Sequence, residues 1–386
     1  MKSIKMFVYP NKLNIIFDKL KKFDIKPIFV GGYVRDHFLQ IKSKDIDIEL
    51  YNADNFEQIV EILKEFGNPN IIGKSFGVIK LCIDDLDIDF SLPRLESKVS
   101  NGHRGFKVKT FKDLDFKTAS KRRDFTINAI GYDVFEKKYL DFYNGINDLK
   151  TKKLKFIDKN TFQEDPLRIL RAVQFCARFE LQIDKELFST CRDMLDKNLL
   201  DELPLERIYK EIKKLLLKSK HPSIGLKLLQ DLDIKLFQID DEKLKNIDYF
   251  ISFKTTNNKT NLAILLALLY NNSAFNLEKL TNSKSLKNEI YMLLHVAEYF
   301  SAKRSTISYN IAKDLNFDIL ALFLKALHVE DNIINNLESL KPKINGKDLL
   351  EKGIEPSKEY SLILQKIYEA QLKGEDTTVV LRNLSQ

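Results

Sequence analysis

The sequence predicts an α+β domain followed by an all-helical remainder. Nine of the thirteen glycines lie at or before Gly145, which places turns and strands in the first part of the chain. From about Leu149 onward, Leu, Ile and Lys recur at intervals of three and four residues, the spacing typical of helices. Because 386 residues are too many for one ordinary hydrophobic core, we expect two or three domains.

Apolar periodicity predicts the individual elements. Alternation or short apolar runs indicate strands, and spacings of three and four indicate helices. Joints between domains are expected at 144–153 and 219–223. The expected strands are Val78–Ile83, Leu86–Leu92, Asn128–Val134 and Lys138–Phe142, and the expected helices are Asn11–Phe23, Phe56–Phe66, Leu167–Phe179, Glu206–Leu217 and Ile319–His328.

Composition is that of a soluble globular protein. The 63 Lys and Arg residues exceed the 55 Asp and Glu residues, for a net charge of +8. An anionic partner fits this excess, although solvated lysine faces would give the same total. Three cysteines without metal-like spacing, and a first segment without the apolar core of a signal peptide, favour the cytoplasm. The longest apolar run, Leu262–Tyr270, is too short to span a bilayer and predicts a buried helix.

The stretch Ile28–Leu50 carries the first chemical signal. Asp45 and Asp47 are two residues apart on an expected strand, so both side chains point to the same face. Two carboxylates this close repel unless a cation neutralises them, which suggests a hard metal bound by oxygen. Gly31 and Gly32 precede them and would let the backbone approach a bulky anion. The alternative is a solvent-exposed strand face after a glycine turn.

Asp89 is the candidate for a third carboxylate of such a site. It shares one face of its expected strand with Asp87. We expect this strand to lie antiparallel beside Asp45–Leu50, which would bring Asp89 to the acidic pair. An exposed hairpin face is the alternative.

Two later motifs point to a nucleotide. In KRRDFTINAI (Lys121–Ile130), the paired arginines suit phosphate or ribose, and Asp124 or Asn128 suits a ribose hydroxyl, although an ordinary basic turn would read the same way. In QEDPLRILRAVQFCARF (Gln163–Phe179), Pro166 fits a first helical position. The alternative for this second motif makes Asp165 a helix cap and its arginines surface cations.

Together, GGYVRDHFLQ…DIDIE, KRRDFTINAI and EDPLRILRAVQFCARF resemble, in order and spacing, the class II family of bacterial CCA-adding tRNA nucleotidyltransferases and poly(A) polymerases. LPLERIYKEI (Leu203–Ile212) and INGKDLLEKGIEPS (Ile344–Ser357) extend the resemblance over most of the chain. One departure is 355–359, where relatives often have a turn rich in Gly and Pro. The resemblance implies a nucleotidyltransferase head with a mixed β-sheet at 1–148, a base-recognising helical neck at 149–220, and a tRNA-binding helical body and tail at 221–386.

The resemblance also implies roles for individual residues. Asp45, Asp47 and Asp89 would hold two Mg²⁺ ions as the catalytic acids. Ten residues would bind the nucleotide, the first three through the triphosphate and the next three through the ribose: Gly31, Gly32, Arg35, Arg123, Asp124, Asn128, Glu164, Asp165, Arg168 and Arg171.

By the same resemblance, Asp165 and Arg168 would read the incoming base. They are three apart and therefore on one helix face. Cytosine and adenine both present an amino donor beside a ring-nitrogen acceptor, whereas uracil and guanine present the reverse order. A carboxylate accepts and a guanidinium donates, so one Asp–Arg pair would admit CTP and ATP and exclude UTP and GTP.

The acceptor would be tRNA held by its phosphates, with no membrane or protein partner implied. Lysines suit a duplex that is recognised by shape, although solvated helix faces are the alternative for each of them. The candidates are Lys210, Lys213, Lys214, Lys218, Lys220, Lys341, Lys343 and Lys347.

Three functions fit these motifs: CCA addition, poly(A) or partial CCA addition, and non-catalytic RNA binding. Poly(A) polymerases of this family tend to carry a long basic C-terminal extension, and the last residues here, GEDTTVVLRNLSQ, do not resemble one, which favours tRNA as the acceptor. The presence of all three acids disfavours a non-catalytic relative. The charged stretch 93–120 should be mobile and act as the lever that changes the pocket from C to A. By resemblance, its length favours full CCA addition.

Overall fold

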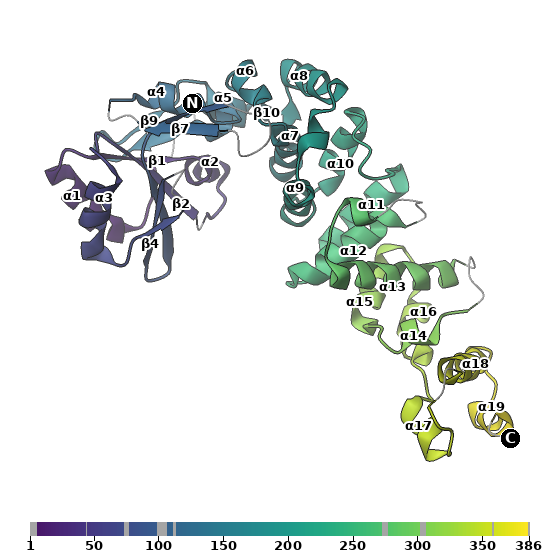
Figure 1. Cartoon of the computed structure of the whole chain (residues 1–386). Helices are drawn as coiled ribbons and strands as arrows, with labels where there is room; N and C mark the ends of the chain where they lie inside the picture. The colour runs from purple at the N-terminus through teal and green to yellow at the C-terminus, as the bar shows by residue number, and fades with distance from the viewer. Residues whose placement is uncertain are drawn as a thin grey trace. The chain divides into compact units, whose positions relative to one another are not determined.

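The computed structural model describes residues 6–43, 45–72, 77–98, 106–110, 113–271, 277–301, 306–356 and 359–384 (Figure 1). It separates into two compact units, Met1–Pro204 and Leu205–Gln386. The first unit contains every strand described and the second is helical, which confirms the expected α+β head and helical remainder. The finer division at residues 148 and 220 stays a prediction.

A mixed seven-stranded sheet forms the centre of the first unit. Its strand order is β3-β4-β5-β2-β1-β8-β9. The strands are β1 (Lys26–Val30), β2 (Asp45–Tyr51), β3 (Asn70–Ile72), β4 (Val78–Ile83), β5 (Leu86–Ser91), β8 (Gly131–Asp133) and β9 (Lys138–Leu140).

One strand pairing differs from the expectation. β5 runs parallel to β2, with Asp47 opposite Asp89, and not antiparallel to it. The reason is the path of the chain between them: it crosses through helix α3 (Phe56–Leu63) and then folds β3, β4 and β5 as an antiparallel meander. The last strand of that meander returns in the direction of β2. The expected neighbourhood of the acids is therefore correct and the expected direction is wrong.

The two faces of the sheet have different coverings. On one face, Phe29 of β1 packs against Phe17 of helix α1 (Asn14–Lys22), with ring centroids 5.7 Å apart. On the other face, Ile28 and Tyr51 join a buried cluster with Phe116 of the short helix α4 (Phe116–Ser120). Strand alternation puts the acids of β2 on this second face.

The segment between β5 and β8 holds elements that the sequence did not predict. Strands β6 (Arg94–Lys98) and β7 (Phe106–Thr110) pair as a separate antiparallel ribbon. The central part of the proposed lever, residues 99–105, and residues 111–112 lie outside the described residues. Of the expected strand Asn128–Val134, only Gly131–Asp133 forms a strand, β8, and Asn128 is the last residue of a 3-10 helix, Thr126–Asn128.

The first unit ends in a group of helices beside two short strands. Pro166 flanks the start of α7, and Phe175 of α7 contacts Phe125 at a ring-centroid distance of 5.4 Å, which joins this helix to the head. The elements are α5 (Gly145–Lys150), β10 (Lys153–Leu154), α6 (Lys159–Gln163), α7 (Leu167–Phe179), β11 (Gln182–Ile183) and α8 (Lys185–Asp196).

The second unit packs around α12, which is buried along nearly its whole length and confirms the buried helix expected there. Within the described ranges, no helix is long and apolar enough to cross a membrane. Residues 357–358 of the divergent 355–359 turn lie outside those ranges. The helices are α9 (Leu205–Lys218), α10 (Pro222–Asp231), α11 (Asp241–Phe253), α12 (Asn258–Tyr270), α13 (Lys284–Phe300), α14 (Tyr309–Ala312), α15 (Phe317–Ala326), α16 (Asp331–Asn335), α17 (Gly346–Glu351), α18 (Tyr360–Leu372) and α19 (Thr377–Leu384).

Candidate active site

Strands β2 and β5 place four carboxylates on one face of the sheet. Asp45 lies opposite Asp87 and Asp47 opposite Asp89. Burial raises the pKa of Asp47 to about 6; Arg123 works against this shift, and the charges of Asp89 and Asp45 add to it. The charged form of Asp47 is therefore disfavoured when no cation lies beside it.

These acids do not converge into a preformed coordination shell. Across the part of the chain that the structure describes, no three His, Cys, Asp or Glu side chains are grouped to hold a metal. Asp89 lies 3.2 Å from the ammonium nitrogen of Lys80, and Asp87 accepts a hydrogen bond from Cys82. The donors nevertheless fit a hard divalent cation, because they are carboxylate oxygens in register and one of them is held in an environment that disfavours its charge.

The glycine turn lies directly beside the acids. Gly31 has a φ of +67° and caps helix α2 (Gly32–Leu39). A Cβ atom at Gly31 would lie 3.2 Å from Nη1 of Arg123 and 3.4 Å from Oδ2 of Asp47. Glycine is thus required both by the backbone conformation and by the approach of these two side chains. The turn, an acid and an arginine that were proposed separately from the sequence meet at one point.

Arg35 does not face this turn as a free cation. Its side chain is buried, and its Nε and Nη2 atoms donate to Asp36 at 2.8 and 2.6 Å. Its Nη1 atom donates to Oδ1 of Asn128 at 2.7 Å. The guanidinium also lies 4.5 Å from the ring centroid of Phe179. Its Nη2 atom lies 3.4 Å from the position that a Cβ would take at Gly32. Arg35 thus lies beside the turn and holds Asn128, and its direct contact with a triphosphate stays a prediction.

Asp124 is the centre of a buried polar network. It accepts from Nδ2 of Asn128 at 2.9 Å and from Nε of Arg171 at 2.7 Å. Burial alone would raise the pKa of Asp124, but Arg171, Asn128 and Arg168 together hold it below its ordinary value. Arg171 is thus an ion-pair partner of the head and not the surface cation of the alternative interpretation. Through Asn128 and Arg35, this network joins α2, the 3-10 turn and α7.

The base-reading candidates lie at the start of α7. Asp165 accepts a hydrogen bond from the backbone of Leu167 at 3.2 Å, as a capping residue does. Arg168 donates to the carbonyl oxygens of Thr161 and Arg122 at 2.6 and 2.8 Å. Glu164 is half-buried immediately before them. Arg168 is therefore anchored to α6 and to the turn at Arg122, and its position relative to Asp165 is set by those carbonyl groups.

Glu49 was not among the residues predicted from the sequence. It is 1% exposed, and its Oε1 atom accepts from Nη2 of Arg122 and from Nη2 of Arg123, each at 2.7 Å. Its Oε2 atom accepts from the hydroxyl of Tyr51 at 2.9 Å. The alternation of Asp45, Asp47 and Glu49 along β2 was the available signal, since positions two apart share one face.

Four of the eight lysines expected to contact tRNA lie on α9 of the second unit: Lys210, Lys213, Lys214 and Lys218. Lys210 and Lys213 are exposed. Lys214 is half-buried and lies 2.7 Å from Glu211, a carboxylate that is 3% exposed. Lys214 therefore neutralises a buried charge, whereas Lys210 and Lys213 present their charge to solvent.

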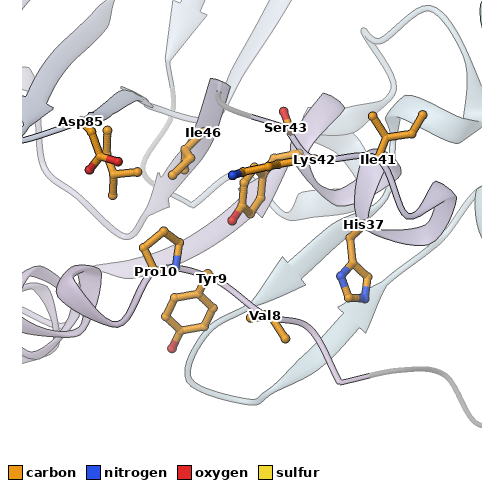
Figure 2. Close-up of a pocket in the computed structure, with 11 residues that line it drawn as sticks. Val8, Tyr9, Pro10, His37, Ile41, Lys42, Ser43, Ile46 and Asp85 are labelled. Carbon is orange, nitrogen blue, oxygen red and sulfur yellow. The ribbon is translucent and has the colours of Figure 1, made fainter.

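A cavity of about 600 Å³ lies on the face of the seven-stranded sheet opposite to the acids (Figure 2). Ile46 lines it and falls between Asp45 and Asp47 on β2, so it points away from the acids. Tyr9 and Pro10 of the N-terminal segment form its other wall, and Lys42 extends over it. Its lining contains none of the candidate site residues, so this cavity is not the candidate active site.

Comparison with known families and relatives agrees with this geometry. Residues 28–155 match the family described as the poly A polymerase head domain, and residues 180–238 match the probable RNA and SrmB-binding site of polymerase A. The CCA-adding enzyme of Ligilactobacillus salivarius is 28% identical over 91% of this chain and 89% of its own length. The multifunctional CCA protein of Psychromonas ingrahamii is 35% identical over 52% of this chain and 47% of its own length.

Solved structures share the fold. An apo form of a CCA-adding enzyme covers 98% of this chain and 96% of its own, with a TM-score of 0.72 and 23% identity. The Thermotoga maritima CCA-adding enzyme complexed with tRNA covers 98% of this chain and 96% of its own, with a TM-score of 0.68 and 22% identity.

Proposed function

Because the chain belongs to the bacterial family of CCA-adding enzymes and poly(A) polymerases, we propose that it completes the 3′ end of tRNA by adding CCA from CTP and ATP. The observation that carries the proposal is the meeting of Asp47, Gly31 and Arg123 at one point, beside the in-register Asp89. Acids for metal, a backbone turn and a guanidinium for phosphates are what nucleotidyl transfer requires.

In this proposal Asp45, Asp47 and Asp89 hold two Mg²⁺ ions. Bound divalent cations would supply activation of the acceptor hydroxyl and stabilisation of the charge on the departing pyrophosphate. The chain itself supplies carboxylates in register on β2 and β5. Burial disfavours the charged form of Asp47, and a bound cation would stabilise that form.

The remaining head residues bind and orient the nucleotide. The amide groups of Gly31 and Gly32, at the start of α2, and the guanidinium of Arg35 beside Gly32 hold the triphosphate. The resemblance implied a ribose contact for Arg123, and we assign this residue to the triphosphate because its Nη1 atom lies at the Gly31 turn. Asp124 and Asn128 hold the ribose. Arg35 also supports the ribose contact, because its hydrogen bond to Asn128 fixes the orientation of that side chain. A fixed arrangement lowers the barrier since the reacting groups need no reorganisation.

Asp165 and Arg168 select the base in this proposal, with Glu164 and Arg171 as their neighbours. The hydrogen bonds from Arg168 to Thr161 and Arg122 fix its guanidinium, so the order of donor and acceptor on the selecting edge is fixed as well. An incoming UTP or GTP would leave polar groups of the site without partners.

Replacing Asp165 with alanine is expected to weaken the use of CTP and ATP and to relax the exclusion of UTP and GTP. The fold should persist with a loss of roughly 1 kcal/mol, because the side chain also caps α7. Incorporation of each nucleotide into tRNA ending before CCA measures the effect. Asp184→Ala is the matched control, since Asp184 accepts from a backbone amide two residues on at the start of α8. Intact selectivity with only a lower Tm would show that Asp165 is a cap alone.

The exposed lysines of α9 are proposed to contact tRNA phosphates. We expect tRNA affinity to fall steeply as the salt concentration rises. Lys210→Gln and Lys213→Gln should each reduce the slope of log affinity against log salt concentration, by roughly one for each phosphate that the variant no longer binds. Lys214 is a poor target because its removal would leave Glu211 buried without its cation. Lys22→Gln, an equal charge change at the exposed end of α1, is the control. An unchanged slope in both α9 variants would place the acceptor elsewhere.

One experiment tests the proposed function directly. The purified protein is incubated with Mg²⁺ and tRNA transcripts that end before CCA, after CC and after CCA, with CTP and ATP supplied separately and together. CCA addition predicts two C residues from CTP alone, one A on the CC transcript and no extension of the complete end. Continued A addition would indicate a poly(A) polymerase, addition of C or A alone a partial enzyme, and binding without extension a non-catalytic relative.

A further inference from the structure

One buried carboxylate, that of Glu49, holds the two arginines of the KRRD loop (residues 121–124). Glu49 lies in the middle of β2 with 1% of its surface exposed, and a single oxygen of it accepts hydrogen bonds from two guanidinium groups. The hydroxyl of Tyr51 occupies the other oxygen. Because both carboxylate oxygens have partners, the orientation of the carboxylate is fixed, and so is the position of the arginines that depend on it.

The geometry of Arg123 follows from this contact. Its Nη2 atom is bound to Glu49, and its Nη1 atom lies at the Gly31 turn, within 3.2 Å of the position a Cβ would take there. Its Nε atom is buried and has no hydrogen-bond partner among the residues that the structure describes. The hydrogen bond to Glu49 therefore orients the guanidinium, and the charge of Asp47 at the turn attracts it as well.

Two guanidinium groups share the single carboxylate of Glu49. At the turn itself, Arg123 lies beside the carboxylate of Asp47, whose ionised form burial disfavours, so its guanidinium remains suited to an anion there. Arg122 uses its backbone carbonyl to accept from Arg168, which links the same carboxylate indirectly to the start of α7. Glu49 itself touches neither the turn nor any base-reading candidate in these contacts.

We propose that Glu49 is a positioning residue that holds Arg123 at the Gly31 turn so that its guanidinium contacts the triphosphate of the incoming nucleotide. This inference rests on the proposed function for the identity of the nucleotide. The triphosphate is common to every nucleotide, so Glu49 governs how tightly nucleotides bind and leaves the choice among bases to α7. The two roles are therefore separable by experiment.

The test is Glu49→Gln, which keeps the shape and removes the charge. We expect KM for CTP and for ATP to rise about tenfold each, with the ratio between them and the exclusion of UTP and GTP unchanged. Asp133→Asn is the matched control: Asp133 is a fully buried carboxylate of the same sheet, paired with Lys26 at 2.6 Å. It should lower Tm without moving KM. If Glu49→Gln lowers Tm and leaves KM at the wild-type value, Glu49 is only structural and the inference is overturned.

A double-mutant cycle identifies the residue through which Glu49 acts. In an Arg123→Gln background, Glu49→Gln should add little further loss, whereas fully additive losses would contradict positioning through Arg123. If Glu49→Gln does not fold, Glu49→Asp, which keeps the charge on a shorter side chain, is measured with the same cycle and the same criteria. Calorimetric binding of CTP with Mg²⁺ gives the same comparison without tRNA, so a failure of CCA addition in the wild type is distinguishable from a failure of this inference.

Discussion

Replacement of Asp47 with asparagine is expected to abolish nucleotide addition while leaving tRNA binding nearly intact. Asp47 is the carboxylate that lies at the Gly31 turn and in register with Asp89, so its charge is central to any cation held there. A bound cation contributes several kcal/mol of transition-state stabilisation, so we expect turnover to fall by roughly 1,000-fold or more. Asp45→Ala should have the same effect. Single-turnover addition of CMP, measured beside tRNA affinity, separates the two quantities.

The same substitution should not destabilise the metal-free protein. The pKa of Asp47 is raised to about 6, so the folded state holds its proton more tightly than the unfolded state and its charged form opposes folding. Its contribution to stability therefore falls as the pH rises through this range, and a neutral asparagine at pH 7 should give an equal or higher Tm without Mg²⁺. Asp87→Ala, on the same face of β5 but paired with Cys82, is the control and should keep its activity. Near-normal turnover by both the Asp47 and the Asp45 variants would remove the basis of the proposed mechanism.

Strand alternation explains why the acids were predictable from the sequence. A spacing of two residues fixes the face of Asp45, Asp47, Asp87 and Asp89 without knowledge of the fold. The direction of β5 was not predictable in this way. A local hairpin predicts that β5 runs antiparallel to β4, but the direction of the strand on its other edge depends on how the chain crosses through α3 from β2 to the meander. The direction of β5 relative to β2 is therefore set by packing between segments distant in sequence, and apolar periodicity carries no information about such packing.

The partners of the charged side chains were the part that the sequence could not supply. Arg35, Arg168 and Arg171 all lie in recognisable motifs, yet each has a partner far along the chain besides any local one: Asn128 is 93 residues from Arg35, Arg122 is 46 residues from Arg168, and Asp124 is 47 residues from Arg171. A motif shows that an arginine is present and does not show whether its guanidinium faces a ligand or a buried carboxylate. Glu49 illustrates the same limit, since its two arginine partners are 73 and 74 residues away.

Replacement of Asp124 with asparagine is expected to reduce both activity and stability. The change removes the buried negative charge with which Arg171 pairs, for which we expect a loss of about 3 kcal/mol in the free energy of unfolding. It also disturbs the proposed ribose contact, and loss of a hydrogen bond to a charged group together with misplacement of Asn128 should lower kcat/KM by roughly 100-fold.

The pH dependence of stability distinguishes this ion pair from a simple packing effect. Arg171, Asn128 and Arg168 overcome the effect of burial and hold the pKa of Asp124 below its ordinary value of 3.8. A lowered pKa means that the ionised carboxylate stabilises the folded state above about pH 4 and that this contribution is lost as the pH falls through the folded-state pKa. The Asp124→Asn variant should therefore lose less stability than the wild type as the pH is lowered from about 4 through the folded-state pKa. Asp148→Asn, which removes a buried carboxylate hydrogen-bonded to Thr126 in the same region, should lower Tm and leave the KM for nucleotides unchanged. Equal acid sensitivity of the Asp124 variant and the wild type, with an unchanged KM, would show that Asp124 neither pairs with Arg171 in solution nor supports the nucleotide.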